Sequence, residues 1–136
     1  MSRSRQGSRR IGAAEERAAA DFLVQHGVEI VERNFRSGRT GEIDLIGYDG
    51  RDLVFFEVKY RSSDGCGAPE ESVTPAKQRV ISQTARFYLA RERISPDRPI
   101  RFDVIAIRPA AAQEGGGSRI ALHWVRNAFN YCGPSV

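Results

Sequence analysis

Three carboxylates and a lysine, Glu42, Asp44, Glu57 and Lys59, fall in two neighbouring apolar segments of the chain. The segments flank an Asp49-Gly50 dipeptide, and Asp-Gly between such segments is the strongest short-range signal for a β-hairpin. The sequence therefore predicts antiparallel strands at about residues 42–48 and 52–61. Acidic groups and a lysine on adjoining strands are side chains that can bind a metal ion and act on a phosphate.

Alternation of side chains along each strand brings the four residues to one face of the predicted hairpin. Glu42, Asp44 and Ile46 share a face of the first strand, and Glu57 and Lys59 share the same face of the second. A two-residue loop would pair Glu42 with Glu57, whereas a four-residue loop would set Asp44 opposite Glu57. In both registers the side chains are neighbours, roughly 5–8 Å apart.

Three carboxylates at this spacing repel one another, and ionising all of them in a half-buried site costs free energy. A divalent cation removes that cost, and hard carboxylate oxygens suit Mg²⁺ or Mn²⁺. We therefore predict that Asp44, Glu57 and Glu42 bind Mg²⁺ (or Mn²⁺). Lys59 beside the metal would hold a phosphate oxygen or lower the pKa of an attacking water.

The alternative is an edge hairpin whose acidic side chains point into solvent. A Glu and a Lys two residues apart are common, so this pair alone does not decide between the two interpretations. Phe55, Phe56 and Val58 favour the metal site, because they indicate a second strand that is buried on both faces.

The same residues resemble a known nuclease motif. Asp44, followed on the next predicted strand by Glu57-Val58-Lys59, is similar to the PD-(D/E)xK core of restriction enzymes and archaeal Holliday junction resolvases. Ile43 replaces the proline of the superfamily name, as in many members. Over about residues 11–130 the chain resembles the bacterial YraN-like family of small, endonuclease-like proteins. The segments that carry this resemblance are Asn34-Phe35-Arg36, Gly41 to Ile46, Phe56 to Lys59 and Arg101 to Ile105.

The resemblance implies a metal-dependent nuclease that hydrolyses phosphodiester bonds in DNA, including branched or junction DNA. Asp44 and Glu57 would bind the metal, and Lys59 would assist the water or the transition state. Resolvases of this superfamily act as dimers, so a homodimer is open, although no stretch of the sequence identifies a dimer surface. A second class also stays open: a non-catalytic or partner-dependent module that keeps the nuclease fold and binds nucleic acid.

Glu15 is a further catalytic and metal-binding candidate. It lies on a helix predicted from Ile11 to His26, near the centre of the apolar stripe, whereas Glu16 lies at its margin. Superfamily resolvases also place an acid on the first helix. The alternative is a partly exposed acid at a helix start, where the helix dipole favours negative charge.

Four cations are candidates for binding the phosphates of nucleic acid. Arg36 and Arg39 lie in a basic turn before the hairpin, and Arg61 follows it. A helix is predicted at about residues 75–93, with Thr74 as its N-cap, Pro75 as its first residue and an apolar stripe of Val80, Ile81, Thr84, Phe87 and Tyr88. Lys77 lies in its first turn, where a cation is electrostatically unfavourable. We therefore expect an anion next to Lys77, either the site carboxylates or a phosphate. A solvated loop, and a lysine that reaches into water, are the alternatives.

Composition fits a single soluble domain. The chain has 136 residues, and its net charge of +4 and pI near 9.5 favour a polyanionic partner. Residues 1–10, with arginines among Ser and Gly, are predicted to be a disordered basic arm, and residues 11–136 a single domain. Cys66 and Cys132 lack metal-ligand spacing, which favours a reducing cytoplasm. No apolar run reaches transmembrane length, so we expect no membrane partner.

The predicted elements come in the order helix, three strands, helix, two strands. This order predicts an α/β sandwich around a central mixed β-sheet of about five strands flanked by helices. The resemblance makes the expected fold restriction-endonuclease-like. Asp103, on the predicted strand from Ile100 to Ile107, is expected to be structural and to pair with an arginine.

Overall fold

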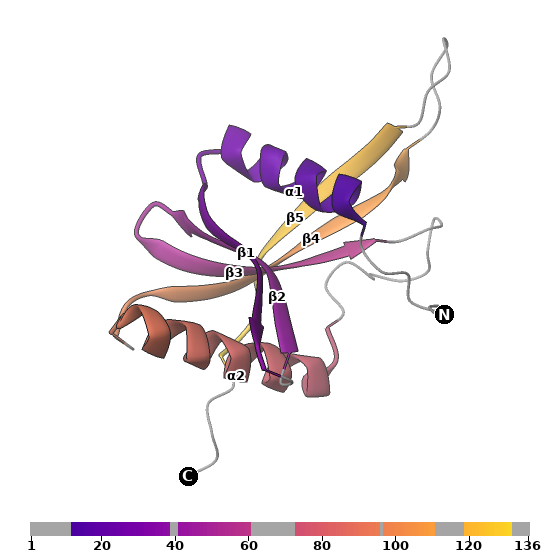
Figure 1. Cartoon of the computed structure of the whole chain (residues 1–136). Helices are drawn as coiled ribbons and strands as arrows, with labels where there is room; N and C mark the ends of the chain where they lie inside the picture. Colours follow the sequence, from indigo (N-terminus) through magenta and orange to yellow (C-terminus); the bar gives the residue numbers. More distant parts are fainter. Residues whose placement is uncertain (1–11, 39–40, 61–72, 96, 111–118, 132–136) are drawn as a thin grey trace.

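One mixed β-sheet carries a helix on each of its faces (Figure 1). This computed structural model describes residues 12–38, 41–60, 73–95, 97–110 and 119–131. The order of elements is the predicted α-β-β-β-α-β-β, so the predicted α/β fold is confirmed. The elements are α1 (Ala13–Gln25), β1 (Glu29–Ser37), β2 (Gly41–Asp49), β3 (Asp52–Tyr60), α2 (Pro75–Glu92), β4 (Ile100–Ala110) and β5 (Arg119–Phe129).

The basic arm predicted for residues 1–10 lies outside the described residues, as do Arg39, Arg61 and both cysteines. In the described part of the chain, no helix combines the length and the apolar character needed to cross a membrane.

The strands lie in the sheet in chain order, and β3 is the central strand. All neighbours pair antiparallel except β3 and β4, which are parallel and are joined through α2. Because β3 has a strand on each side and a helix over each face, the residues from Leu53 to Phe56 and Val58 are all buried. The alternative of a solvent-exposed edge hairpin is therefore wrong.

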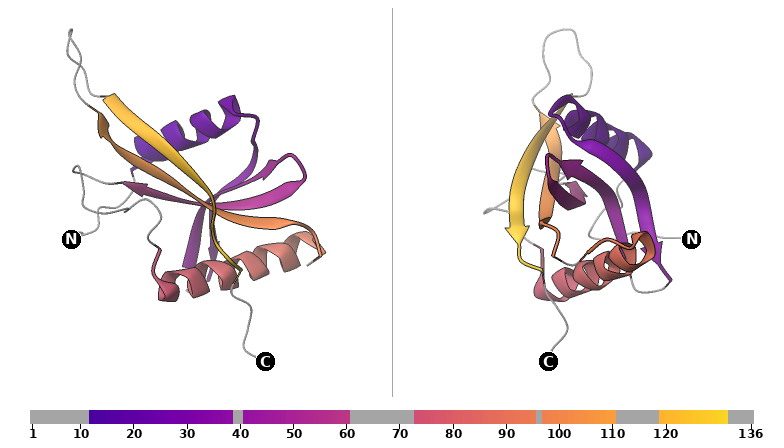
Figure 2. Two further views of the ribbon diagram at one scale, coloured as in Figure 1. Left: turned by 180° about the vertical axis from the view of Figure 1, so that it is seen from behind. Right: turned by 90° about the vertical axis from the view of Figure 1, so that its left-hand side faces the viewer.

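Each helix covers its own apolar cluster, and the two clusters lie on opposite faces of the twisted sheet (Figures 1 and 2). Leu23 of α1 packs with Val54, Phe56 and Ile105, whereas α2 covers the larger cluster. That cluster includes Ile46, Phe55, Ile81, Tyr88 and Phe102.

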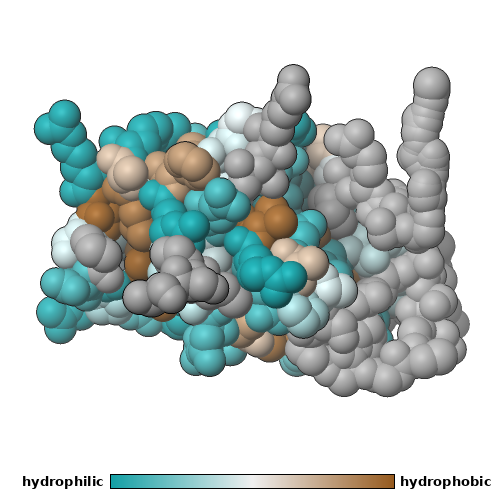
Figure 3. All heavy atoms as spheres, turned by 90° about the horizontal axis from the view of Figure 1, so that it is seen from below, coloured by the Kyte–Doolittle hydropathy of each residue, from teal (hydrophilic) through white to brown (hydrophobic). Residues whose placement is uncertain are grey.

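One apolar residue predicted for the buried stripe of α2 is exposed instead. Thr74 caps α2 and Pro75 begins it, as predicted, and Ile81 and Tyr88 are buried. Phe87, however, is 47% exposed, and Leu89 is buried instead. Seen from the α2 side, the apolar areas of the surface are interrupted by hydrophilic side chains (Figure 3).

The β2–β3 hairpin has the second of the two predicted registers, but it closes with a two-residue turn and not with the four-residue loop predicted for that register. Tyr48 pairs with Leu53 and Asp49 pairs with Asp52, so Gly50 and Arg51 form the turn. Continuing this register along the strands would set Asp44 opposite Glu57. The hairpin therefore brings together the two carboxylates that matter most for the predicted metal site.

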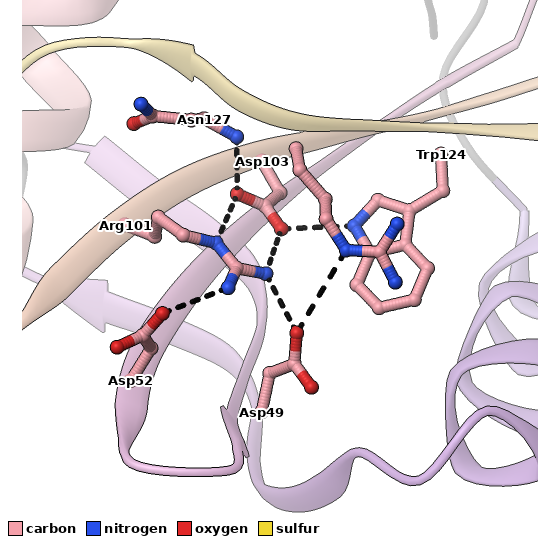
Figure 4. A network of polar contacts seen from close by, with 7 residues as sticks. Asp49, Asp52, Arg101, Asp103, Trp124 and Asn127 are labelled. Carbon is pink, nitrogen blue, oxygen red and sulfur yellow. Dashed lines mark hydrogen bonds and ion pairs between the residues drawn. The ribbon is translucent and has the colours of Figure 1, made fainter.

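A buried polar network joins the turn of this hairpin to β4 and β5 (Figure 4). Asp103 is fully buried, and its carboxylate accepts hydrogen bonds from Arg101, from Trp124 Nε1 and from the backbone N–H of Asn127. Arg101 also pairs with Asp49 and Asp52, at 2.9 Å each. The prediction that Asp103 has a structural role and pairs with an arginine is confirmed.

Candidate active site

The regular pairing of β2 with β3 ends at the pair of Leu45 and Phe56, and Asp44 directly precedes Leu45 in β2. Its Oδ2 accepts a hydrogen bond of 2.8 Å from the backbone N–H of Val58. A carboxylate therefore stands where a strand carbonyl would normally accept this hydrogen bond. A hydrogen bond to an ionised acceptor is stronger than a neutral one, so it fixes Asp44 against β3.

The side chains around Asp44 do not follow strict alternation. Ile43 and Ile46 both lie in the cluster under α2, whereas Leu45 lies in the cluster under α1. The strict alternation on which we based a shared face for Glu42, Asp44 and Ile46 is therefore interrupted between Ile43 and Ile46. Opposite this part of β2, the paired strand β1 contains Asn34 with a φ of 53°, a conformation that interrupts a regular strand.

Asp44 and Glu57 come together as predicted, and both acids are partly buried. Burial raises the pKa of Asp44 to about 7, with a further increase from the charge of Glu57, while the Val58 N–H opposes the shift. Burial also raises the pKa of Glu57, against the opposing charges of Lys77 and Lys59. Asp44 thus titrates near neutral pH, where a proton or another cation is needed to balance its charge.

Glu42 belongs to the same electrostatic group, because its charge raises the pKa of both Asp44 and Glu57. It also forms an ion pair with Arg36, at 3.3 Å, across the β1–β2 ladder. Arg36, which we predicted to bind nucleic acid, is therefore next to the predicted metal ligands.

Lys77, in the first turn of α2, has an anionic neighbour, as we expected for a cation at that end of a helix. Its Nζ is 3.4 Å from Oε2 of Glu57, so the expected anionic neighbour is a site carboxylate. Lys59 also acts on Glu57, whose pKa it lowers. The sequence predicted Lys59 as a neighbour of the acids, and it left open whether Lys77 pairs with them, with a phosphate or with water.

A close approach of α2 to the start of β2 explains how Lys77 reaches Glu57. Gly41, the first residue of β2, lies so close to α2 that a Cβ there would collide with Cγ1 of Val80. The same Cβ would lie 3.0 Å from Oγ1 of Thr84. Figure 1 shows the start of β2 running to the N-terminal half of α2, the end that carries Lys77.

The first turn of α1 supplies the acid that acts on Asp44 from the other face of the sheet. The charge of Glu16 raises the pKa of Asp44, and Oε1 of Glu16 accepts a hydrogen bond of 2.9 Å from the side chain of Asn34. Glu15, the residue that we predicted, is half-buried one position earlier in the same turn. Its role in catalysis and metal binding stays a prediction.

Sequence reasoning missed Glu16 and Asn34 as members of the site. The helical periodicity placed Glu16 at the margin of the apolar stripe. From this position its side chain reaches Asn34 of β1. The signal for Asn34 was its residue type, because Asn adopts positive φ more readily than most residues.

Comparison of the sequence with known proteins identifies its family. The model of a family described as "Uncharacterised protein family UPF0102" matches residues 15–107. The chain belongs to the UPF0102 family. This confirms the resemblance to YraN-like proteins.

Three relatives of this UPF0102 protein match it along nearly their whole length. A UPF0102 protein of Symbiobacterium thermophilum is 47% identical over 90% of this chain and 98% of its own. One from Chromohalobacter salexigens is 44% identical over 96% of this chain and 98% of its own. One from Marinobacter nauticus is 42% identical over 93% of this chain and 97% of its own. These names give the family and do not state an activity.

The carboxylates of this UPF0102 protein can be compared with what a metal requires. Within the described residues, no three His, Cys, Asp or Glu side chains converge as a complete set of metal ligands. Mg²⁺ usually binds through one or two carboxylates, with water and phosphate oxygens completing its coordination. Asp44 and Glu57 fit this smaller requirement, because they are two partly buried carboxylates whose charges repel each other.

Proposed function

We propose that this UPF0102 protein is a metal-dependent nuclease that hydrolyses phosphodiester bonds in DNA. The observation that carries the proposal is the partly buried pair Asp44 and Glu57, two neighbouring acids that each have a raised pKa. Two like charges in a buried position are unfavourable unless a cation compensates them, and buried carboxylate pairs are typical of functional sites. The similarity of Asp44 and Glu57-Val58-Lys59 to the PD-(D/E)xK core supports the same reaction.

Each side chain of the candidate site has its own role in the proposed reaction. Asp44 and Glu57 hold Mg²⁺ or Mn²⁺, and the backbone N–H of Val58 fixes the orientation of Asp44. When bound, the metal supplies positive charge to the scissile phosphate and activates the attacking water. Lys59, on the same strand as Glu57, stabilises the negative charge that develops on the phosphate oxygens.

Glu42 and the acids at the start of α1 contribute around this pair. The negative charges of Glu42 and Glu16 raise the pKa of Asp44, so both increase the affinity of the Asp44–Glu57 pair for a cation. Glu15 and Glu42 are the further metal-binding candidates, directly or through water. Arg36 and Lys77, together with Arg39 and Arg61, are the proposed contacts to the DNA backbone.

A second candidate is a non-catalytic or partner-dependent module that binds nucleic acid. The observation that favours it is that Lys77 and Arg36 already pair with Glu57 and Glu42. Carboxylates neutralised by the protein's own cations have less need of a metal. In that case a partner protein would have to complete the site, or the chain would bind DNA without cutting it.

A cleavage assay separates the two candidates. Linear, flap and four-way-junction DNA would be incubated with Mg²⁺ or Mn²⁺ and with the wild-type protein, Glu57→Gln or Glu92→Gln. Gln keeps the shape of Glu57 and removes its charge, whereas Glu92 is an exposed acid at the far end of α2 and serves as the matched control.

A nuclease predicts cutting by the wild-type protein and by Glu92→Gln, and none by Glu57→Gln. Equal cutting by all three proteins would remove the site assignment. Binding of the same DNAs without cutting by any of the three would favour the binding module or the partner-dependent enzyme.

A further inference from the structure

The ion pair between Lys77 and Glu57 joins two groups that the proposed reaction uses for different purposes. Glu57 is a proposed ligand of the metal, and Lys77 is a proposed contact to the phosphate. In the structure, Nζ of Lys77 and Oε2 of Glu57 are 3.4 Å apart. The ammonium of Lys77 therefore lies where a metal ion would approach Glu57. The carboxylate of Glu57 lies where a phosphate would approach Lys77.

The exposure of the two side chains indicates their arrangement. The Glu57 side chain is 13% exposed, whereas that of Lys77 is 47% exposed. Lys77 therefore lies on the solvent side of Glu57, where a nucleic acid can reach it. The flexible stem of a lysine allows the ammonium to change partners without movement of the helix.

Electrostatics give the direction of the exchange. Glu57 already has a second cation beside it, since Lys59 also lowers its pKa. A divalent cation at Asp44 and Glu57 would repel the ammonium of Lys77 and compete for the same carboxylate. An unpaired cation in the first turn of α2 is unfavourable, and the first turn of α2 contains no acid. A phosphate in the site is then the anion available to Lys77.

We propose that Lys77 is a substrate-positioning residue that exchanges partners: it pairs with Glu57 in the metal-free protein and with a DNA phosphate once a divalent cation is bound. This inference rests on the proposed function. The exchange couples the two binding events, so metal increases the affinity for DNA and DNA increases the affinity for metal by the same factor. The affinity of the protein for DNA at the site is therefore higher when the metal is bound.

The test is the salt dependence of DNA binding, measured by fluorescence anisotropy with and without Ca²⁺, a hard cation that also binds carboxylate oxygens. The proteins are the wild type, Lys77→Met, Lys77→Arg and the control Arg79→Met, and a gel confirms that the DNA stays intact. Arg79 is exposed on the same helix, about 200° around its axis from Lys77, and its change alters net charge equally.

With Ca²⁺, Lys77→Met should make the negative slope of log K against log salt shallower by about 0.9, the value for one phosphate contact on duplex DNA. Without Ca²⁺, Lys77→Met and wild type should have the same slope. Lys77→Arg should keep the wild-type behaviour in both conditions, and Arg79→Met should behave alike with and without Ca²⁺.

Calorimetric titration with Ca²⁺ in the absence of DNA adds an independent readout. Lys77→Met should bind Ca²⁺ at least as tightly as wild type, because the competing ammonium has gone. A merely structural role for Lys77 predicts weaker binding instead.

Three results would overturn the exchange: a slope change in Lys77→Met that is equal without Ca²⁺, no slope change with Ca²⁺, or weaker Ca²⁺ binding by Lys77→Met. In each of these cases a wild-type protein that binds both Ca²⁺ and DNA leaves the proposed function standing. A wild-type protein that binds neither ligand overturns both proposals.

Discussion

At the scale of single residues, the candidate site depends on acids that the fold partly buries. Asp44 and Glu57 were identifiable from residue type, strand periodicity and the Asp-Gly turn between them. Glu16 was not, because its reach to the sheet depends on a hydrogen bond from Asn34, and the backbone of Asn34 is set by tertiary structure. Contacts between side chains of different helices and strands cannot be predicted from the periodicity of a single segment.

The raised pKa of Asp44 makes stability depend on pH in a predictable direction. The folded-state pKa of about 7 lies above the unfolded value of about 3.9, so the folded protein binds the proton more tightly. The stability from this proton is fully present below the unfolded pKa and is lost as pH rises through 7.

Asp44→Asn should remove this pH dependence in the metal-free protein. Relative to wild type, we expect the free energy of unfolding of the variant to increase by on the order of 2 kcal/mol between pH 5 and pH 8. Urea unfolding in the presence of a chelator measures it, with the exposed Asp21→Asn of α1 as the control. Parallel pH profiles for wild type and Asp44→Asn would contradict the assignment of this pKa.

At the scale of elements, the hairpin, the caps and the order of helices and strands followed from the sequence. The exact face of α2 did not. Phe87 and Leu89 are both apolar and two positions apart, so periodicity alone could not decide which of them the sheet would cover. The contact of α2 with Gly41 fixes the helix position, and its close approach involves residues distant in the sequence.

Gly41→Ala should push α2 away from β2. A Cβ at position 41 would collide with Cγ1 of Val80, a stiff β-branched side chain. Overpacking of this kind costs about 1–3 kcal/mol of stability. Urea unfolding of Gly41→Ala, Val80→Ala and the double variant forms a cycle, in which the double variant should be more stable than the sum of the single effects predicts. Additive effects would show that this contact does not position the helix.

The polar network at the other end of the hairpin has a purely structural role in this account. Asp103→Ala should leave Trp124 Nε1 and the backbone N–H of Asn127 without their acceptor, so we expect a loss of about 3–5 kcal/mol. Asp52→Ala removes an acid from the exposed rim of the same network and should cost less than about 1 kcal/mol. Equal effects of the two changes on the urea midpoint would contradict this division.

At the scale of the whole molecule, the site forms where the first turns of both helices meet the open end of the β2–β3 hairpin. Glu16 of α1 acts on Asp44 from one face of the sheet, and Lys77 of α2 pairs with Glu57 from the other. The buried network ties the turn at the opposite end of this hairpin to β4 and β5. The scaffold is therefore fixed at one end, and the acids are gathered at the other.

The paired carboxylates are tested most directly by calorimetric titration of Mn²⁺ into the wild-type protein, Asp44→Asn and Glu57→Gln at pH 8, with Glu92→Gln as the control. If the pair is the metal site, wild type and control bind Mn²⁺, and each site variant loses tenfold or more in affinity, because the loss of even a residue that only supports a metal ligand costs about tenfold to a hundredfold. Mn²⁺ binding that is unchanged in both site variants, or absent from the wild type, would contradict a metal-dependent site at Asp44 and Glu57.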